Sequence, residues 1–223
     1  MKKIIFTFVV IQLAIVIFIF LNTKGSEVNN ASVLVKEKIK LPDPNTTGGM
    51  PLMDVLRNRK SSRKFSDKML SDQMLSDLLW AAFGINRPES GMRTAPTANN
   101  TQAMDIYVIM HSGTYIYNAK DNTLDLITDE DLSELAGSQD FVKIAPVNLV
   151  YVADYSKLKR GSEKEIYSGA HAGFIGENVY LFCTSAGLNT VIRAWIDKEE
   201  LKKRLKLEEE QYIILAQTVG YPE

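Results

Sequence analysis

One apolar run constrains the fold of this chain more than any other feature. Residues 147–153 are apolar except for Asn148. A strand of this composition has both faces buried, so it belongs in the middle of a sheet that is covered on both sides. The long, mostly apolar segment 163–186, which Gly187 can end, predicts the largest of the covering helices.

The remaining pattern mixes helices and strands without regular alternation. Helical spacing of apolar residues predicts helices over 51–59, 72–83, 129–136 and 197–205, with Ser71 and Asp197 as N-caps and Gly84 at C′. Strands are predicted over 105–110, 190–196 and 212–219, and a hairpin over 114–118 and 123–127. This order predicts an α+β fold with helices around a central sheet.

Composition and residue counts exclude several classes of protein. With 45% hydrophobic and 24% charged residues the chain is globular, and a net charge of −1 provides no basic surplus for nucleic acid. Cys183 is the only cysteine, which excludes an intramolecular disulfide, and its apolar neighbours indicate a buried small hydrophobe. His111 and His171 lie in no metal or catalytic motif, so we expect no metal site and no catalytic triad.

The N-terminus has the pattern of a targeting segment. Lys2 and Lys3 precede an apolar run at 4–21 that is followed by polar residues. Residues 1–25 are therefore predicted to be a cleaved signal peptide or a membrane anchor, between which length does not decide. The flanking lysines predict an exported body, periplasmic or anchored facing outside the cytoplasm. Turn-forming residues predict a linker over 26–50, and the domain occupies 51–223.

The first candidate site is a cluster of four cations and two hydroxyls at residues 59–65. If this stretch is extended, alternate residues point the same way, which brings Arg59, Ser61 and Arg63 to one side. Arginine guanidinium groups fork onto phosphate oxygens, and a serine hydroxyl adds a short hydrogen bond. The cluster therefore predicts either a phosphate site or, as for most charge runs, a solvated basic edge.

Two further stretches are candidates. The loop at 93–102 consists mostly of small and amide residues, which suit the polar edge of a flavin ring but also occur in an ordinary polar turn. Arg193 lies inside a predicted apolar strand, where an arginine must find a partner or reach solvent, so a structural salt bridge is the alternative to a site role. Neither a G-x-G-x-x-G motif nor a P-loop occurs, so no Rossmann unit is expected.

These stretches occur in this order in the FMN-dependent nitroreductase superfamily, which the chain resembles over about residues 51–222. It is most similar to the branch that includes the thiazoline/oxazoline dehydrogenase-like proteins. The matching segments are RKSSRKF at 59–65, LWAAFGINR at 79–87, RTAPTANNTQ at 93–102, AGL at 186–188 and QTVGYP at 217–222.

The resemblance implies a sandwich with a central, mostly antiparallel sheet flanked by helices, and a homodimer with FMN at the subunit interface. It implies that Arg59, Ser61 and Arg63 hold the FMN phosphate, with Lys60 in the same motif. Near the ribityl chain and the ring it puts Thr97, Asn100 and Gln102, from the same or the partner subunit. Beside the ring it puts the backbone of Ile192, Arg193 and Ala194.

An enzyme of this kind moves electrons by a ping-pong mechanism between a donor such as NAD(P)H and a small organic acceptor. The cofactor carries the chemistry, so no catalytic side chain is required. Outside the cytoplasm NAD(P)H is scarce, which favours a membrane electron carrier or an organic substrate as donor. The alternatives are a dehydrogenase of azoline-type or peptide substrates and a non-enzymatic, tethered flavin-binding module.

Overall fold

The computed structural model describes residues 37–158 and 163–223. The predicted targeting segment at 1–25 and the first part of the predicted linker lie outside the described residues. Among the helices of the described ranges, none is long and apolar enough to cross a membrane.

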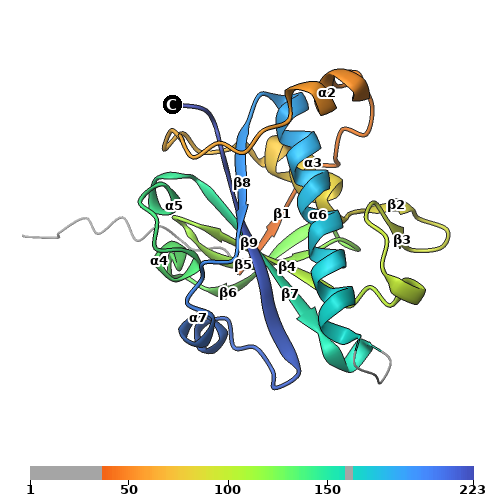
Figure 1. Cartoon of the computed structure of the whole chain (residues 1–223), viewed down its shortest axis with the longest axis vertical. Coiled ribbons are helices and arrows are strands. Elements are labelled where there is room, and N and C mark those ends of the chain that lie inside the picture. The colour runs from red at the N-terminus through yellow and green to blue at the C-terminus, as the bar shows by residue number, and fades with distance from the viewer. Residues whose placement is uncertain (1–36, 159–162) are drawn as a thin grey trace, which may run out of the picture. The chain divides into compact units, whose positions relative to one another are not determined.

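A seven-stranded sheet is the centre of the domain (Figure 1). The strand order is β1-β6-β5-β4-β7-β9-β8, and every neighbouring pair is antiparallel. The strands are β1 (Lys38–Lys40), β4 (Met104–Met110), β5 (Gly113–Asn118), β6 (Thr123–Thr128), β7 (Val147–Asp154), β8 (Asn189–Arg193) and β9 (Gln211–Gly220). A separate small hairpin contains β2 (Ile85–Arg87) and β3 (Met92–Arg93). The predicted α+β fold with a mostly antiparallel central sheet is confirmed.

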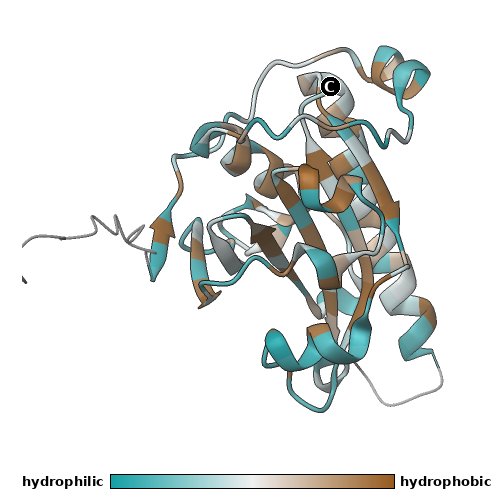
Figure 2. Ribbon diagram, turned by 90° about the vertical axis from the view of Figure 1, so that its left-hand side faces the viewer, coloured by the Kyte–Doolittle hydropathy of each residue, from teal (hydrophilic) through white to brown (hydrophobic). Residues whose placement is uncertain are grey.

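The apolar run at 147–153 lies in β7, between β4 and β9, as predicted. Leu149 and Tyr151 point into a core that they share with α3 (Asp72–Phe83) and α6 (Lys164–Ala186). Val150 and Val152 point to the opposite face, which α4 (Ser133–Ala136) and α7 (Lys198–Arg204) cover. Both faces of the strand are buried, which explains why it lacks polar alternation. Figure 2 shows apolar residues gathered along the central strands.

The long helix α6 packs against α3, β8 and β9. It ends as predicted, because Gly187 takes a left-handed conformation (φ 71°). The short helix α2 (Leu52–Asn58) rests on α6, and α5 (Phe141–Ile144) precedes β7. Ser71 and Asp197 cap α3 and α7 as predicted, since each side chain accepts a hydrogen bond from a backbone amide three residues later.

Some local predictions differ from the structure. Gly84 follows α3 with a φ of −72°, so it is not left-handed as a C′ glycine would be. A Cβ at this position would lie 2.5 Å from the Trp80 side chain, so close packing requires the glycine. Strand β8 ends at Arg193, three residues before the predicted end at Ile196.

The predicted linker is partly built into the domain. Its residues Lys38–Lys40 form β1, which pairs with β6 at the edge of the sheet. Leu41 follows with 1% of its surface exposed and joins the main core. The packed structure therefore includes residues before Met50.

Candidate functional site

The basic cluster is an extended loop along the outer edge of β8. Arg59 leaves α2 with a ψ of 124°. The Ser62 amide donates to the Thr190 carbonyl at 3.0 Å, and the Asn189 side chain donates to the Lys64 carbonyl at 2.7 Å. Since β9 pairs with the other edge of β8, the loop occupies the edge that the sheet leaves open.

Tyr180 on α6 ties this loop to β8 a second time. Its side chain is buried, and its hydroxyl lies 2.8 Å from Ser61 Oγ and accepts a hydrogen bond from the Ile192 amide at 3.0 Å. The Arg59 guanidinium lies over the ring, 5.1 Å from its centroid. Sequence reasoning missed Tyr180. The sequence did contain a signal for it: Tyr180 lies in a helix predicted to be buried, and the hydroxyl of a buried tyrosine needs a hydrogen-bond partner.

The cations of the basic loop have no carboxylate partner within the described residues. None of the ion pairs found there includes Arg59, Lys60, Arg63 or Lys64. Lys60, Ser61 and Arg63 are exposed, and Arg59 is half-buried. Uncompensated positive charge on a loop of fixed shape is suited to an anion that carries several oxygens.

The second candidate loop, at 93–102, has a strained backbone. Around the 3-10 turn η1 (Ala98–Asn100), three residues other than glycine have left-handed φ values: Asn99 (53°), Asn100 (51°) and Gln102 (48°). Such conformations are sparsely populated and concentrate at binding sites, where the surrounding structure maintains them.

Arg93 and Gln102 hold this loop in shape. The Gln102 side chain accepts from Arg93 Nε at 2.8 Å and donates to the Gly91 carbonyl at 3.0 Å. Its backbone amide donates to the Thr97 hydroxyl at 3.0 Å. The Arg93 guanidinium also donates to the Phe83 carbonyl at 2.9 Å. Gln102 and Thr97 therefore determine the shape of the loop. Asn100, the third loop residue predicted to lie near the flavin, is exposed.

His171 on α6 anchors the loop from below. With 2% of its surface exposed, it accepts a hydrogen bond from the Ala98 amide at Nε2, at 2.7 Å. An imidazole that accepts at Nε2 is neutral and carries its proton on Nδ1. Burial lowers the pKa of His171, which favours this neutral form. The sequence assigned no role to His171. In the structure it supports the loop at 93–102, which we call the amide loop.

Buried polar atoms without a hydrogen-bond partner concentrate at this loop. The described residues contain four such side-chain atoms, and three are Thr94 Oγ1, Thr101 Oγ1 and His171 Nδ1. The fourth is Arg193 Nε. Buried polar groups are normally paired, so this loop has the properties of a site that is completed by something else. A flavin, with carbonyl oxygens and ring nitrogens at its edge, is chemically suited to these groups.

The two loops contact different parts of α6 (Figure 1). Tyr180, which binds the basic loop, and His171, which binds the amide loop, are nine residues apart on the helix. At 1.5 Å per residue this separation is about 14 Å. Within one chain the two sets of predicted residues are therefore not brought into a single cluster.

The Arg193 side chain is hydrogen-bonded within the core. Its guanidinium donates to Asn148 Oδ1 at 2.8 Å, to the Thr218 hydroxyl at 2.7 Å and to the Ala136 carbonyl. Burial lowers its pKa to about 10, and no carboxylate among the described residues pairs with it, so the expected alternative of a salt bridge is wrong. The guanidinium is thus held within the core apart from its Nε atom, and the Arg193 backbone pairs with Ala216 of β9. The Ile192 amide is already bonded to Tyr180, and Ala194 is exposed just after β8.

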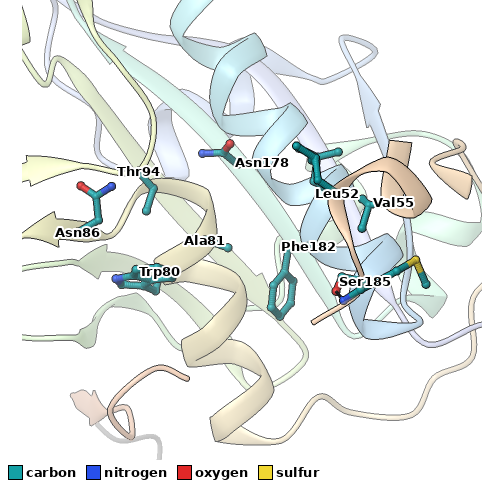
Figure 3. A pocket seen from close by; sticks show the side chains of 11 residues that line it. Leu52, Val55, Trp80, Ala81, Asn86, Thr94, Asn178, Phe182 and Ser185 are labelled. Carbon is teal, nitrogen blue, oxygen red and sulfur yellow. Dashed lines mark hydrogen bonds between the residues drawn. The ribbon is translucent and has the colours of Figure 1, made fainter. Parts of the chain in front are cut away.

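A groove of about 420 Å³ lies between α2, α3 and α6 (Figure 3). Asn86 and Thr94 lie toward one end of the groove, and Leu52, Val55 and Ser185 lie toward the other. Because Thr94 also belongs to the amide loop, the groove adjoins the site with the unpaired polar atoms.

Metal-ligand groups and the single cysteine were the other candidates for a site within the described residues. They contain no group of three or more histidine, cysteine or acidic residues that could hold a metal ion. Cys183 is fully buried, and burial raises the pKa of its thiol, so it is not a nucleophile. The prediction that Cys183 is a buried small hydrophobe is confirmed.

The model of the nitroreductase family matches residues 56–221, which include both loops and β8. The chain belongs to the nitroreductase family. A relative from Methanocaldococcus jannaschii, named "putative nitroreductase", is 33% identical over 195 residues, which are 82% of this chain and 96% of the relative. Membership establishes an oxidoreductase family and confirms the broader part of the predicted resemblance.

Two solved structures are similar to the domain. A "putative nitroreductase" from Ralstonia eutropha has a TM-score of 0.81 and 41% identity, over 85% of this chain and 91% of that chain. The NADPH:FMN oxidoreductase from Vibrio harveyi, complexed with NAD⁺, has a TM-score of 0.58 and 19% identity, over 77% of this chain and 69% of that chain. At this identity the second structure supports the nitroreductase fold alone.

Proposed function

We propose that the protein is an FMN-dependent oxidoreductase that works as a homodimer. The observation that carries the proposal is the basic loop, in which Arg59, Lys60 and Arg63 have no carboxylate partner within the described residues while hydrogen bonds fix the backbone along β8. In this proposal Arg59, Ser61 and Arg63 bind the FMN phosphate, and Lys60 adds to the positive potential.

The amide loop would bind the polar parts of the flavin. Asn100 is exposed, and its side chain has only a long hydrogen bond, from Gln102 Nε2 at 3.3 Å, among the described residues, whereas Thr97 and Gln102 maintain the loop. Thr94 and Thr101 contribute hydroxyl groups that have no partner among residues 37–158 and 163–223. The two loops lie about 14 Å apart along α6, a separation that one extended FMN can bridge, so we infer that the amide loop acts on FMN held by the basic loop of the same or the partner subunit.

A homodimer would also cover apolar side chains that the single chain leaves in solvent. On α6 these are Ile166 (70% exposed) and Phe174 (46%), and on α2 they are Leu52, Met53 and Leu56. Exposed apolar surface of this extent is typical of an interface between proteins. Light scattering on the FMN-loaded chain should give the mass of a dimer, and a monomer that retains FMN would contradict this part.

When bound, FMN supplies the capacity to accept and release a hydride or electrons. In this proposal Arg59, Ser61 and Arg63 would hold the phosphate of FMN, and the backbone at Ile192–Ala194 would run beside its ring. A donor and an acceptor would occupy the groove beside Thr94 in turn, in a ping-pong scheme that needs no side-chain nucleophile. NAD(P)H is one candidate donor, and the V. harveyi structure is named as an oxidoreductase of NADPH and FMN.

The export of the protein is a separate proposal that rests on Lys2, Lys3 and the apolar run at 4–21. If it holds, a membrane electron carrier or an organic substrate replaces NAD(P)H as donor. A reporter that works only outside the cytoplasm should be active when it is fused after Gly25. The narrower resemblance to azoline dehydrogenases rests on sequence motifs and is a further proposal.

The visible spectrum of the purified full-length chain tests the proposed function. We expect flavin absorption bands and the release of FMN, rather than FAD, on denaturation. Reduction of the bound flavin by a donor and its reoxidation by an acceptor would separate an enzyme from a flavin-binding module. A colourless protein that also takes up no added FMN would contradict the proposal.

A further inference from the structure

Tyr180 stands between the basic loop and the sheet. Its hydroxyl has two hydrogen-bond partners within the described residues, the Ile192 amide at 3.0 Å and the Ser61 hydroxyl at 2.8 Å. Only 6% of the tyrosine is exposed, whereas Ser61 is exposed to solvent. The phenol therefore connects an inner group, on the edge of β8, to an outer one on the loop.

The direction of each of these two hydrogen bonds follows from which groups can donate. The Ile192 amide can only donate, so the Tyr180 oxygen accepts that bond. The proton of Tyr180 then has one acceptor among the described residues, Ser61 Oγ, and a buried hydroxyl rarely leaves its proton unpaired. With its oxygen accepting from Tyr180, Ser61 keeps its own proton free to donate outward.

We propose that Tyr180 is a positioning residue for the phosphate of the bound flavin. It receives a hydrogen bond from the edge of β8 and donates one to Ser61, which makes Ser61 a donor toward the phosphate. This inference rests on the proposed function, because it needs a phosphate at the basic loop. Hydrogen bonds in series polarise one another, so Ser61 becomes a better donor to an anion than an isolated serine.

The same ring also orients a charge. The Arg59 guanidinium lies 5.1 Å from the centroid of Tyr180, within the range of a cation–π contact. The phenol thus acts on two of the three proposed phosphate ligands, Ser61 through its hydroxyl and Arg59 through its face. A tyrosine that only filled space would affect ligands with and without a phosphate equally.

The test compares FMN with riboflavin, which lacks the phosphate, on the full-length chain. Dissociation constants are measured by flavin fluorescence for the wild type, Tyr180→Phe, Ser61→Ala and the double variant. We expect the wild type to prefer FMN, and each single variant to reduce that preference about tenfold. The double variant should lose no more than either single variant, because both changes interrupt the same series of bonds. Ser61→Thr, which keeps the hydroxyl, should retain the preference.

Tyr115→Phe is the matched control. Tyr115 is also a buried phenol, and it donates to the Ser112 carbonyl at 3.4 Å from β5, which β4, β7 and β9 separate from β8. Its loss should weaken the fold and leave the preference for FMN unchanged. Preference retained in Tyr180→Phe, or a double variant whose loss is the product of the two single losses, would overturn the inference and leave the FMN site standing. Equal binding of FMN and riboflavin by the wild type would remove the phosphate site itself.

A second measurement does not depend on the folding of Tyr180→Phe. The amide resonance of Ile192 should differ between the FMN and riboflavin complexes of the wild type, because the phosphate acts on it through Ser61 and Tyr180. In Ser61→Ala this difference should disappear. The same Ile192 shift in both wild-type complexes would contradict the series of bonds.

Discussion

The basic loop and the amide loop contact the same helix, yet they are built in opposite ways. The basic loop has hydrogen-bonded backbone contacts with β8 and leaves its charges in solvent. The amide loop has three strained residues, and buried atoms of Thr94, Thr101 and His171 have no hydrogen-bond partner in the part of the chain that the structure describes. The first is complete without a ligand, and it can bind by charge. The second is incomplete, and it requires a ligand or a partner to satisfy it.

This difference predicts that the two loops respond differently to substitution. Changes in the basic loop should act on ligands with a phosphate and leave the stability of the fold almost unchanged. Changes in the amide loop should act on stability as well as on every flavin, with or without a phosphate. The predictions below test this contrast, from the largest expected effect to the smallest.

Arg93→Ala should have the largest effect on the fold. It removes charged hydrogen bonds to Gln102 and Phe83, and such bonds contribute about 1.5–3 kcal/mol each, so the free energy of unfolding should fall by about 3 kcal/mol. Affinities for FMN and riboflavin should fall together. Urea unfolding and fluorescence titration measure the two effects. Arg57→Ala, which loses only an exposed pair with Asp54, is the control and should cost less than about 1 kcal/mol.

Arg63→Ala should change affinity without changing the fold. If Arg63 forks onto the phosphate, FMN affinity should fall about tenfold to a hundredfold, while riboflavin binds as before. Arg63→Lys keeps the charge but loses the fork, so its FMN affinity should lie between the two. Equal losses for both ligands would assign Arg63 to the fold, and no loss for either would make it a solvated surface cation.

The amide loop should also depend on pH through His171. Burial lowers the pKa of His171 in the folded chain, so below its usual value of about 6.5 the unfolded chain takes up a proton that the folded chain does not. The contribution of His171 to stability is therefore present above pH 6.5 and decreases as the pH falls below it. The slope from one group is at most about 1.4 kcal/mol per pH unit.

His171→Gln identifies the source of that slope. The glutamine oxygen can accept from the Ala98 amide but does not titrate, so the variant should lose this part of the pH dependence of unfolding. Arg63→Ala should keep it, since the basic loop does not contact His171. An unchanged slope in His171→Gln would mean that another group titrates.

Thr101→Val should give the smallest effect, and one of opposite sign on stability. The valine has nearly the same shape and removes a buried hydroxyl that has no partner among the described residues. The free energy of unfolding of the ligand-free variant should therefore equal that of the wild type or exceed it by up to about 1 kcal/mol. Riboflavin affinity should decrease if the hydroxyl binds the flavin. A variant that is less stable without ligand would show that Thr101 is satisfied in the free protein.

The sequence predicted the elements whose signal is local. The apolar run of β7, the caps Ser71 and Asp197, and the end of α6 at Gly187 each follow from neighbouring residues. The strand β1 was missed because Lys38–Lys40 gains its conformation from pairing with β6. Gly84 was predicted as a C′ glycine, but it is required because a side chain there would collide with Trp80. Such a packing contact is not visible in the local sequence.

The candidate site was predicted in part for the same reason. The basic loop and the amide loop are visible as runs of suitable residues, whereas their supports come from distant positions. Tyr180 is 119 residues from Ser61, and His171 is 73 residues from Ala98. The role of Arg193 depends on Asn148 and Thr218, which only the sheet brings to it.

The position of the basic loop has a consequence for the solubility of the protein. An exposed edge strand offers unpaired amides and carbonyls to any other strand, which is a route to aggregation. On β8 the Thr190 carbonyl is already occupied by the Ser62 amide, and the Ile192 amide by Tyr180. The proposed binding loop therefore also shields the end of the sheet, so a substitution that displaces it would endanger the monodispersity of the protein as well as its affinity for a ligand.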